Sequence, residues 1–233
     1  NDAGDRILIG GTIASNNVGN VNYWTRSGSV WTRRTSLSNP SGDIAQFGQS
    51  VAISGDGTRA IVGGPANSRV CIFTIGATSG SLEFNVAGGG WYDQLGYFVD
   101  INTDGSVAVA GGYAYNGDTG WVKVYRRTGT TWTSTTVNPS NPSSNSYFGR
   151  GVSLSSDGNM LAVGAMYADR QSLANTGTVY IFTWNGTTWT QVSEFQASDP
   201  AANAFYGRVV ALSNDKTRLI VGNEIRNKCY IYK

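Results

Sequence analysis

The stretch FGRGVSLSSDGNMLAVGA, residues 148–165, decides the fold because the chain contains four versions of it. The other versions begin at Phe47, Leu95 and Tyr206, so the pattern recurs about every 50 residues. Each version alternates apolar and small residues, reaches a turn and continues into an almost unbroken apolar run. The turn is Asp-Gly in three versions and Asp-Lys in the last, and Asp-Gly is a strong hairpin signal. Each version is therefore predicted to form a β-hairpin.

Two further strand-like runs follow the hairpins. The third run is strongly apolar, as in RVCIFT at 69–74 and TVYIFT at 178–183, and the fourth carries a tryptophan in WTSTTV at 132–137 and WTQVSEF at 189–195. The N-terminal segment follows the same order of strands but starts at the second one, since RILIGG at 6–11 matches the second strand of the other units. We expect five units, of which the first lacks strand one and the last lacks strand four: residues 1–46, 47–94, 95–147, 148–205 and 206–233.

Repeated four-stranded antiparallel units of this length are typical of a β-propeller. One unit cannot cover its own two apolar faces, whereas neighbours stacked around an axis can. We therefore predict an all-β chain, residues 1–233, that forms a single propeller domain of about five blades. A β-sandwich or an open solenoid would not explain why the four-strand pattern returns in register. In a closed ring the strands of residues 6–37 would lie beside those of 206–233, whereas open edges would indicate a fragment or an assembly subunit.

The composition excludes several classes of function. Only 14% of the residues are charged and the net charge is +2, so the basic pairs Arg33-Arg34 and Arg126-Arg127 are interpreted as solvated strand edges and not as a nucleic-acid site. Histidine is absent, which removes histidine-dependent catalytic and metal sites. The chain has no run of 18 apolar residues to span a membrane. No cofactor and no catalytic residue is predicted.

The two cysteines and the strand-four tryptophans each allow two interpretations. Cys71 and Cys229 fall in strand-like runs, and buried small hydrophobic residues are favoured over a disulfide. The two cysteines therefore do not indicate whether the protein belongs to an oxidising or a reducing compartment. Trp31, Trp132 and Trp189 occupy equivalent repeat positions, which favours packing between blades, while a sugar pocket repeated between blades remains the alternative.

The repeated phrase resembles the FG-GAP repeat, the blade unit of integrin α-subunit propellers and of many secreted bacterial and algal proteins. The best match is residues 148–182, and EFQASDPAANAFYG at 194–207 resembles the linker of a subfamily found in microbial surface proteins. The resemblance covers essentially the whole chain. It implies an extracellular or cell-surface location and a propeller that binds a partner.

The chain departs from that family in two respects. Calcium-binding members carry several spaced aspartates in the loop between strands one and two, whereas this chain has one aspartate in each tight turn. Asp56, Asp104 and Asp157 are therefore interpreted as turn formers, because Ca²⁺ takes about six to eight oxygen ligands. No metal site is predicted. Five units are also fewer than the seven typical of the family, which indicates a small propeller or a piece of a longer one.

The resemblance implies that the loops joining strands two to three, and strand four to the next strand one, share one face that binds the partner. Aromatic rings in these loops could cover the apolar face of a sugar or anchor a protein, with polar neighbours orienting the ligand. The alternative is that the rings pack between blades. The candidate residues are Trp91, Tyr92, Asp93, Tyr113, Tyr115, Asp118, Tyr167, Asp169, Arg170 and Asn203.

These observations favour a non-catalytic extracellular module that recognises a protein or a glycan. One alternative is a structural subunit of an extracellular assembly, which would self-associate or receive flanking segments through the incomplete terminal units. A glycoside-active enzyme is less favoured, since Glu83, Glu194 and Glu224 fall at different repeat positions and form no carboxylate pair. Asn185 begins the sequence Asn-Gly-Thr, an acceptor for N-glycosylation in a predicted exposed turn.

Overall fold

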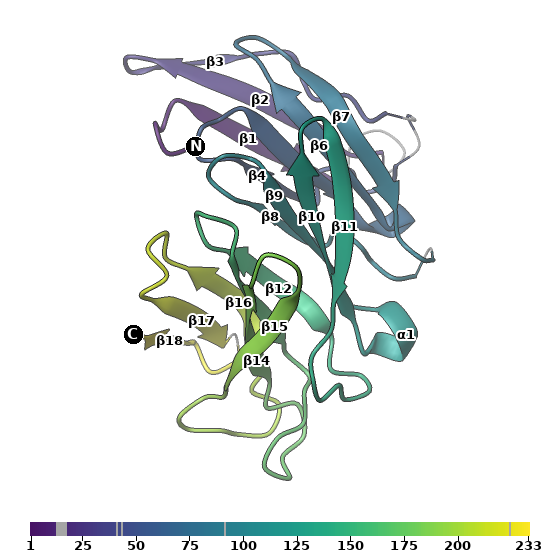
Figure 1. Ribbon diagram of the computed structural model, residues 1–233, viewed down its shortest axis with the longest axis vertical. Coiled ribbons are helices and arrows are strands. Elements are labelled where there is room, and N and C mark those ends of the chain that lie inside the picture. Colours follow the sequence, from purple (N-terminus) through teal and green to yellow (C-terminus); the bar gives the residue numbers. More distant parts are fainter. Residues whose placement is uncertain (13–17, 41, 43, 91, 224) are drawn as a thin grey trace.

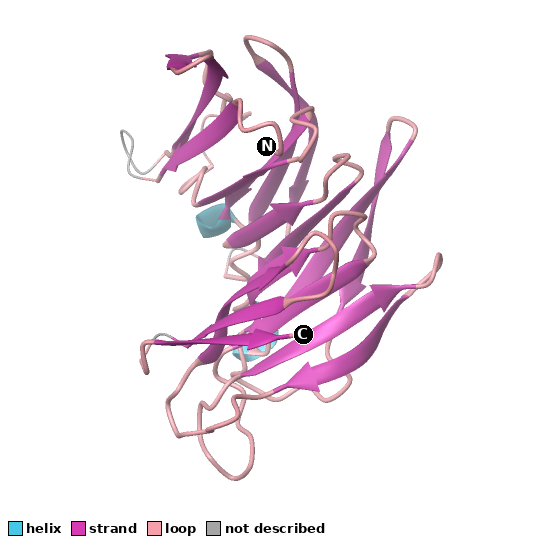
Figure 2. Ribbon diagram, turned by 90° about the vertical axis from the view of Figure 1, so that its left-hand side faces the viewer, coloured by secondary structure: helices cyan, strands magenta, loops and turns pink. Residues whose placement is uncertain are grey.

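The computed structural model describes residues 1–12, 18–40, 42, 44–90, 92–223 and 225–233, and its ordered elements are almost all β-strands (Figure 2). Within these residues the strands form five antiparallel sheets, each built from consecutive strands. The first and last sheets have three strands and the others have four. The first sheet contains β1 (Arg6–Gly11), β2 (Asn20–Ser27) and β3 (Val30–Arg33).

The three complete sheets repeat one order of strands. The second contains β4 (Ser50–Ile53), β5 (Arg59–Gly64), β6 (Arg69–Ile75) and β7 (Gly80–Ala87). The third contains β8 (Phe98–Ile101), β9 (Val107–Gly112), β10 (Trp121–Thr128) and β11 (Thr131–Val137). The fourth contains β12 (Phe148–Leu154), β13 (Met160–Ala165), β14 (Thr178–Trp184) and β15 (Trp189–Phe195).

The fifth sheet contains β16 (Tyr206–Leu212), β17 (Leu219–Asn223) and β18 (Lys228–Tyr232). The loops between second and third strands hold a short 3₁₀ turn, Pro65–Asn67, and the segment α1, Tyr115–Asp118, in which Asn116, Gly117 and Asp118 are left-handed. The sheets are the blades of a five-bladed β-propeller, as the sequence predicted. The register also confirms that the first blade lacks strand one and the last lacks strand four.

Each hydrophobic core lies between two neighbouring blades. The aromatic residue that opens a first strand is completely buried there, as with Phe47, Phe148 and Tyr206. Tyr206 and Val210 of blade 5, for example, share a core cluster with Val179 of blade 4. Burying a large apolar side chain contributes about 1.5–3 kcal/mol, so contacts between blades supply much of the stability.

The glycine that follows the aromatic residue sets the distance between blades. A Cβ atom built on Gly164 of β13 would lie 1.7 Å from the carbonyl oxygen of Gly207 in the next blade. A Cβ on Gly63 would lie 1.8 Å from the carbonyl oxygen of Gly96 in the same way. Gly96 and Gly207 have φ values of 90° and 89°, a region that favours glycine. Two backbones therefore meet with no side chain between them.

The aspartates of the hairpin turns form hydrogen bonds inside those turns. Oδ1 of Asp56 accepts bonds from the Thr58 amide at 2.8 Å and the Ser54 hydroxyl at 2.6 Å. Oδ1 of Asp104 accepts from the Ser106 amide at 2.9 Å. These side chains hold the turn in the way that Asx turns do.

The terminal blades do not pack against each other, and no core cluster of the described residues contains side chains from both. Figure 1 shows the sheets following one another in chain order, with the N-terminal and C-terminal sheets at opposite ends of the series. Apolar residues on the outward faces are exposed: Ile9 of β1 is 48% exposed and Ile231 of β18 is 62% exposed. The first and last blades therefore present uncovered faces.

This arrangement corrects one prediction for the cysteines. Cys71 is buried at the junction of blades 1 and 2, and both thiols are free. Cys229 was expected to be buried, and that expectation is wrong because its strand lies on the uncovered face of blade 5.

Replacing Gly164 with alanine should destabilise the protein by about 2 kcal/mol or more, because the added methyl group meets the backbone of blade 5. The matched control is Gly222→Ala in blade 5, where the nearest described atom to a new Cβ is Val209 Cβ at 3.6 Å. That change should alter the unfolding free energy by less than about 0.5 kcal/mol. Urea denaturation measures both, and equal losses would contradict the glycine argument.

Candidate functional site

Five aromatic rings form a continuous row across blades 3, 4 and 5. The ring centroids of Tyr97 and Tyr113 lie 5.0 Å apart, and those of Tyr113 and Tyr147 lie 5.1 Å apart. Tyr167 continues the row at 4.5 Å from Tyr147, and Phe205 lies 4.9 Å beyond it. We call these residues the aromatic row. All five are half-buried, so each ring is partly accessible to a ligand.

The row joins the two kinds of loop that the sequence expected on one face. Tyr113 and Tyr167 follow second strands, whereas Tyr147 and Phe205 precede first strands. Their alternating ring contacts place both loop types together on the same side of blades 3 to 5. We call this side the loop face.

The backbone does not require aromatic residues at two of these positions. Tyr147 and Phe205 have φ values of 55° and 56°, in the left-handed region that is unusual for bulky residues. The equivalent residues in blades 2 and 3 are Gln46 and Gln94, with φ values of 57° and 56°. Glutamine therefore serves the same turn, and the rings of Tyr147 and Phe205 have a different role.

A buried arginine lies beside one end of the row. Arg150 of β12 is 7% exposed, and its guanidinium carbon lies 4.1 Å from the Tyr97 ring centroid and 5.2 Å from that of Tyr113. Its Nη2 donates a hydrogen bond to the Tyr97 hydroxyl at 3.3 Å, while its buried Nη1 has no hydrogen-bond partner among the described residues. Burial lowers the pKa of Arg150, and the Tyr97 hydroxyl partly opposes this shift.

The charge of Arg150 is not balanced by an ion pair with any carboxylate in the described part of the chain. An acidic residue does lie near the middle of the row. Burial raises the pKa of Tyr147, and the negative charge of Asp118 raises it further. The row thus has a positive group beneath one end and a carboxylate beside its centre.

The predicted candidates divide between this site and other places. Tyr113 and Tyr167 belong to the row and Asp118 lies beside it. Asn203 lies in the loop before Phe205, where its Oδ1 accepts a 2.8 Å hydrogen bond from Asn175 Nδ2. Trp91 lies outside the described residues.

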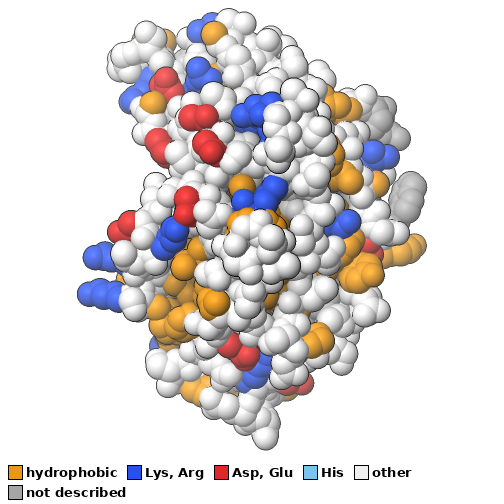
Figure 3. All heavy atoms as spheres, in the orientation of Figure 1, with side chains coloured by type: hydrophobic (Ala, Val, Ile, Leu, Met, Phe, Trp, Pro, Cys, Tyr) orange, Lys and Arg blue, Asp and Glu red, His pale blue; other side chains and the backbone are white. Residues whose placement is uncertain are grey.

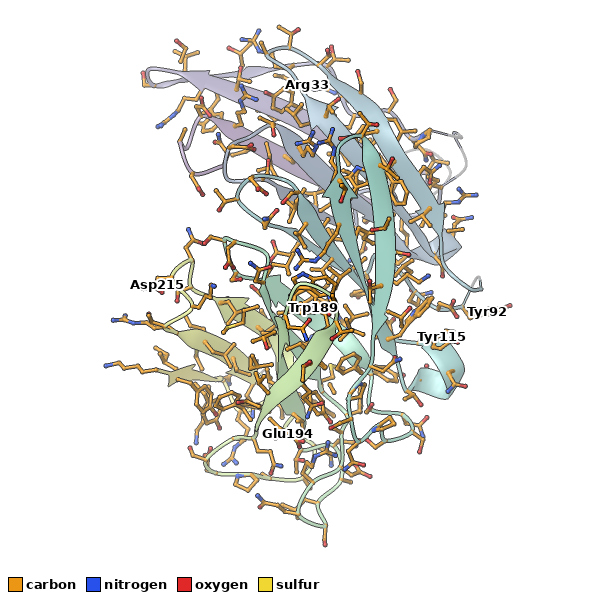
Figure 4. All side chains as sticks on the ribbon, viewed as in Figure 1. Arg33, Tyr92, Tyr115, Trp189, Glu194 and Asp215 are labelled. Atoms are coloured by element: carbon orange, nitrogen blue, oxygen red, sulfur yellow. The ribbon has the colours of Figure 1, made fainter. Side chains whose placement is uncertain are left out.

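Other candidates have structural contacts or no contact with the row. Asp93 is 8% exposed and its Oδ2 accepts a 2.6 Å hydrogen bond from the Gly90 amide, so it closes a turn. Tyr115 stacks on Trp121 with centroids 4.4 Å apart. Tyr92 is 87% exposed and points away from the molecule, as Figure 4 shows.

Two charged candidates in the loop between β13 and β14, Asp169 and Arg170, form contacts within blade 4. Arg170 forms a 2.8 Å ion pair with Glu194 of β15 and donates a hydrogen bond to the Tyr180 hydroxyl. Oδ1 of Asp169 accepts a 2.8 Å hydrogen bond from the Asn175 amide. These contacts order the loop that carries Tyr167.

Sequence reasoning missed four residues of the site: Tyr97, Tyr147, Arg150 and Phe205. Each is adjacent to the repeated aromatic-Gly or Leu-Gly pair, which was interpreted only as a packing signal. The doubled aromatics Tyr147-Phe148 and Phe205-Tyr206 were the available signal, because one ring of each pair enters the core and the other has to face elsewhere.

The pair Arg126-Arg127 and the tryptophans Trp132 and Trp189 have packing contacts, whereas Trp31 is 38% exposed on blade 1. Arg126 stacks on the Trp184 ring at 4.3 Å, and Arg127 forms a 2.5 Å ion pair with Glu83. Trp132 is 7% exposed and lies 6.2 Å from Phe84 of the preceding blade. Figure 3 shows charged side chains of both signs scattered over the visible face.

The end of the propeller opposite the aromatic row holds a polar cavity of about 240 Å³, lined by the ends of β4, β8, β12 and β16 together with Asp2. Asp100 of β8 lines this cavity, and its Oδ2 accepts a 2.8 Å hydrogen bond from the Leu154 amide of the next blade. Burial raises the pKa of Asp100 to about 6, despite this bond. No group of three metal-binding side chains occurs among the described residues.

Replacing Asp100 with asparagine should stabilise the protein above about pH 6. The folded state raises the pKa of Asp100 above its unfolded value, so this group favours folding at low pH and that contribution is lost as pH rises through about 6. Asparagine carries no charge and keeps an oxygen for the Leu154 amide, while its Nδ2 replaces the Oδ1 that accepts a 2.8 Å hydrogen bond from the Ile101 amide, a loss that is the same at both pH values. Thermal unfolding at about pH 4 and pH 7.5 should show the gain at the higher pH alone.

The control is Asp104→Asn, for which the change in stability is expected to have the opposite sign. Burial raises the pKa of Asp104, but hydrogen bonds from Ser106 outweigh it and the net shift is downward. This variant should lose stability near neutral pH, and the loss should shrink in acid. Parallel pH profiles for the two variants would be inconsistent with these assignments.

Comparison with known families agrees with the repeat pattern. The family model described as the FG-GAP repeat matches residues 132–182 and 189–228. This part of the chain, from blade 3 to blade 5, is therefore similar to the FG-GAP repeat. No curated protein sequence matches the chain. None of the helices among the described residues has the length and apolar character needed to cross a lipid bilayer.

Solved structures with similar coordinates include a β-propeller domain and a putative lactonase. The β-propeller domain of Cps50 (Swd1) from Myceliophteria thermophila gives a TM-score of 0.62 at 11% identity, covering 91% of this chain and 63% of that one. A putative 6-phosphogluconolactonase from Bacteroides uniformis gives 0.61 at 13% identity, covering 92% and 60%. A Lactobacillus plantarum protein gives 0.63 at 16% identity, covering 97% and 62%. These likenesses concern the fold, and this chain spans about three fifths of the length of each of these structures.

Proposed function

We propose that this FG-GAP propeller is a non-catalytic, extracellular or cell-surface module that binds a protein or a glycan through the aromatic row. The observation that carries the proposal is the contrast between blades. Gln46 and Gln94 make the same left-handed turn that Tyr147 and Phe205 make, so the aromatic rings are not needed for folding the turn.

The chemistry of the row suits such ligands. Half-buried rings can cover the apolar face of a sugar or anchor an aromatic or aliphatic side chain. The phenol groups can hydrogen-bond to hydroxyls or to a peptide backbone. Arg150 beneath Tyr97 favours a ligand group with negative charge at that end, and Asp118 favours a donor near the middle.

Two of the three glutamates support a role without catalysis. Glu83 binds Arg59 at 2.9 Å and Arg127 at 2.5 Å, and Glu194 binds Arg170 at 2.8 Å. Hydrogen bonds from the arginines outweigh burial and lower the pKa of Glu83, which disfavours it as a general acid. Glycoside hydrolysis, the less favoured alternative, needs a carboxylic acid with a raised pKa beside a second carboxylate.

Replacing Tyr147 or Phe205 with glutamine should weaken ligand binding about tenfold or more and leave the fold intact. The change keeps a residue type that the equivalent turns already use, and it removes one ring of the row. The probes are an oligosaccharide array and a displayed random-peptide library. Tyr92→Ala is the control, because Tyr92 is exposed and outside the row. The proposal fails if neither probe binds, or if the control variant loses as much binding as the others.

Secretion from a eukaryotic cell should attach a glycan to Asn185. This residue lies in an exposed turn, where its Oδ1 accepts a 3.0 Å hydrogen bond from the Thr187 amide. Intact-mass measurement of protein secreted by a eukaryotic host should show a glycan that is absent from Asn185→Gln. An unmodified mass in the parent chain would contradict the assignment.

A second function, a structural subunit of an extracellular assembly, is favoured by the terminal blades. Ile7 and Ile9 are 37% and 48% exposed on blade 1, and Ile220 and Ile231 are 43% and 62% exposed on blade 5. Hydrophobic side chains also gather in Figure 3 over the region that contains β16 to β18. Exposed apolar faces of this kind mark interaction surfaces.

A further inference from the structure

A pocket of about 370 Å³ lies where two loops of blades 3 and 4 meet. One wall is the loop between β9 and β10, residues 113–120, and the other is the linker between β11 and β12, residues 138–147. Figure 1 shows α1, in the first of these loops, close to the end of β11, where the linker starts. We call this site the linker pocket. It shares no lining residue with the aromatic row, and its volume lies in the range of small-molecule sites, about 300–1,000 Å³.

Hydrogen bonds fix the linker at both of its ends. The Phe148 amide donates to the Thr119 carbonyl at 3.1 Å, and the Ser146 hydroxyl donates to the same carbonyl at 3.0 Å. Near the start of the linker, the Ser140 amide donates to Oε1 of Gln191 in β15 at 2.9 Å. The two walls are therefore held in place before a ligand arrives, which lowers the entropic cost of binding.

A tyrosine ring forms the aromatic part of the lining. Tyr115 stacks on Trp121 with ring centroids 4.4 Å apart and an interplanar angle of 21°. Trp121 is 7% exposed, and the Lys123 ammonium lies 4.5 Å from its ring centroid. Tyr115 is 38% exposed, although Trp121 covers one face of its ring. The exposed part of Tyr115 is thus a fixed aromatic surface that a ligand can cover.

Three polar side chains of the lining are free to bind a ligand. Asn116, Asn138 and Ser144 are exposed, and none of them forms a side-chain hydrogen bond to another described residue. Asn185, in an exposed turn of blade 4, instead uses its Oδ1 to accept a 3.0 Å hydrogen bond from the Thr187 amide. Amide and hydroxyl groups both donate and accept hydrogen bonds, so the three free side chains match the hydroxyl groups of a sugar.

The described residues that line the pocket include no charged side chain. The charged neighbours have other contacts: Asp118 interacts with the Tyr147 hydroxyl, and Lys123 lies over Trp121. Pro139 and Pro142 add apolar surface to the lining, and their rings restrict the backbone of the linker. A neutral ligand that has both an apolar face and hydroxyl groups therefore suits the pocket better than an ion does.

We propose that the linker pocket binds one neutral pyranose unit of a glycan. The apolar face of the sugar would lie on Tyr115, and its hydroxyl groups would pair with Asn116, Asn138 and Ser144. A protein side chain suits the pocket less well, because an anchor residue needs a well-packed pocket that removes it from water and these polar groups are exposed. The site is additional to the aromatic row, so the inference goes beyond the proposed function and does not depend on it.

The test titrates nitrogen-15-labelled protein with neutral methyl glycosides of glucose, galactose, mannose and N-acetylglucosamine, followed by NMR. At least one of them should shift the amide signals of Gly117 and Gly120 saturably, with a Kd of about 10 mM or tighter. The methyl glycoside of glucuronic acid should bind more weakly than the best neutral glycoside, because the pocket offers no ion pair. Failure of every neutral glycoside to shift these signals would overturn the inference, as would stronger binding of the acidic sugar.

Two variants remove the proposed contacts. Tyr115→Leu should weaken binding of the best glycoside about fivefold or more, because the sugar loses its aromatic surface. Asn138→Ala should weaken it about threefold or more through the lost hydrogen bond. Asn138 is exposed, so its replacement leaves the fold intact and keeps the test valid if Tyr115→Leu disturbs the loop.

The matched control is Asn141→Ala, which replaces an exposed asparagine of the same linker that does not line the pocket. Its affinity for the glycoside should equal that of the parent chain, and thermal unfolding checks the fold of all three variants. Unchanged affinity in Asn138→Ala, or an equal loss in the control, would contradict the assignment.

Phe205→Gln distinguishes this inference from the proposed function, because it removes a ring of the aromatic row in a different blade junction. Glycoside binding that survives this change and is lost in Asn138→Ala supports the linker pocket, whether or not the row binds a ligand. If Phe205→Gln removes glycoside binding, and the signals that shift belong to Tyr113 and Tyr167, the row is the sugar site. The linker pocket is then wrong, while the proposed function stands.

Discussion

The close approach of two glycines at each blade junction is the contact on which the rest of this structure depends. Gly164 and Gly207 bring two backbones together so tightly that even one methyl group would collide with a carbonyl oxygen. This approach lets the neighbouring aromatic residue enter the core between blades and places successive first strands at a fixed spacing. The repeat tolerates variable loops because the junction, and not the loop, sets the geometry.

The aromatic row follows from that geometry. Each junction forces the residue before the aromatic-glycine pair into a left-handed turn on the loop face. Glutamine occupies this turn in two blades and an aromatic residue occupies it in the next two, so the scaffold supplies a position at which side chains can be chosen for binding. Arg150, next to the same pair, is buried against two of the rings and adds positive charge beside a row of four phenol rings and the Phe205 ring.

The site could be predicted only in part from the sequence. Tyr113, Tyr167 and Asp118 were found because loop aromatics with polar neighbours are a general binding signal. Three residues of the row and its surroundings were missed: Tyr147, Phe205 and Arg150. Their sequence neighbours form the aromatic-glycine pair, which predicts packing. The sequence does not show that a left-handed residue turns its side chain away from the core that its neighbour enters. The contacts of Arg170 and Asp93 could not be predicted either, since their ion pair and turn hydrogen bond depend on strands or loops that fold beside them.

The sequence by itself determined the hairpins, the four-strand unit and the incomplete first and last blades, because alternation, turn residues and glycine positions act over short distances. Only the tertiary structure decided which faces are covered. Cys71 and Cys229 lie in similar apolar strands, yet one is buried and the other exposed. The residues of a strand determine whether one of its faces is apolar. Whether that face is buried depends on whether another blade packs against it.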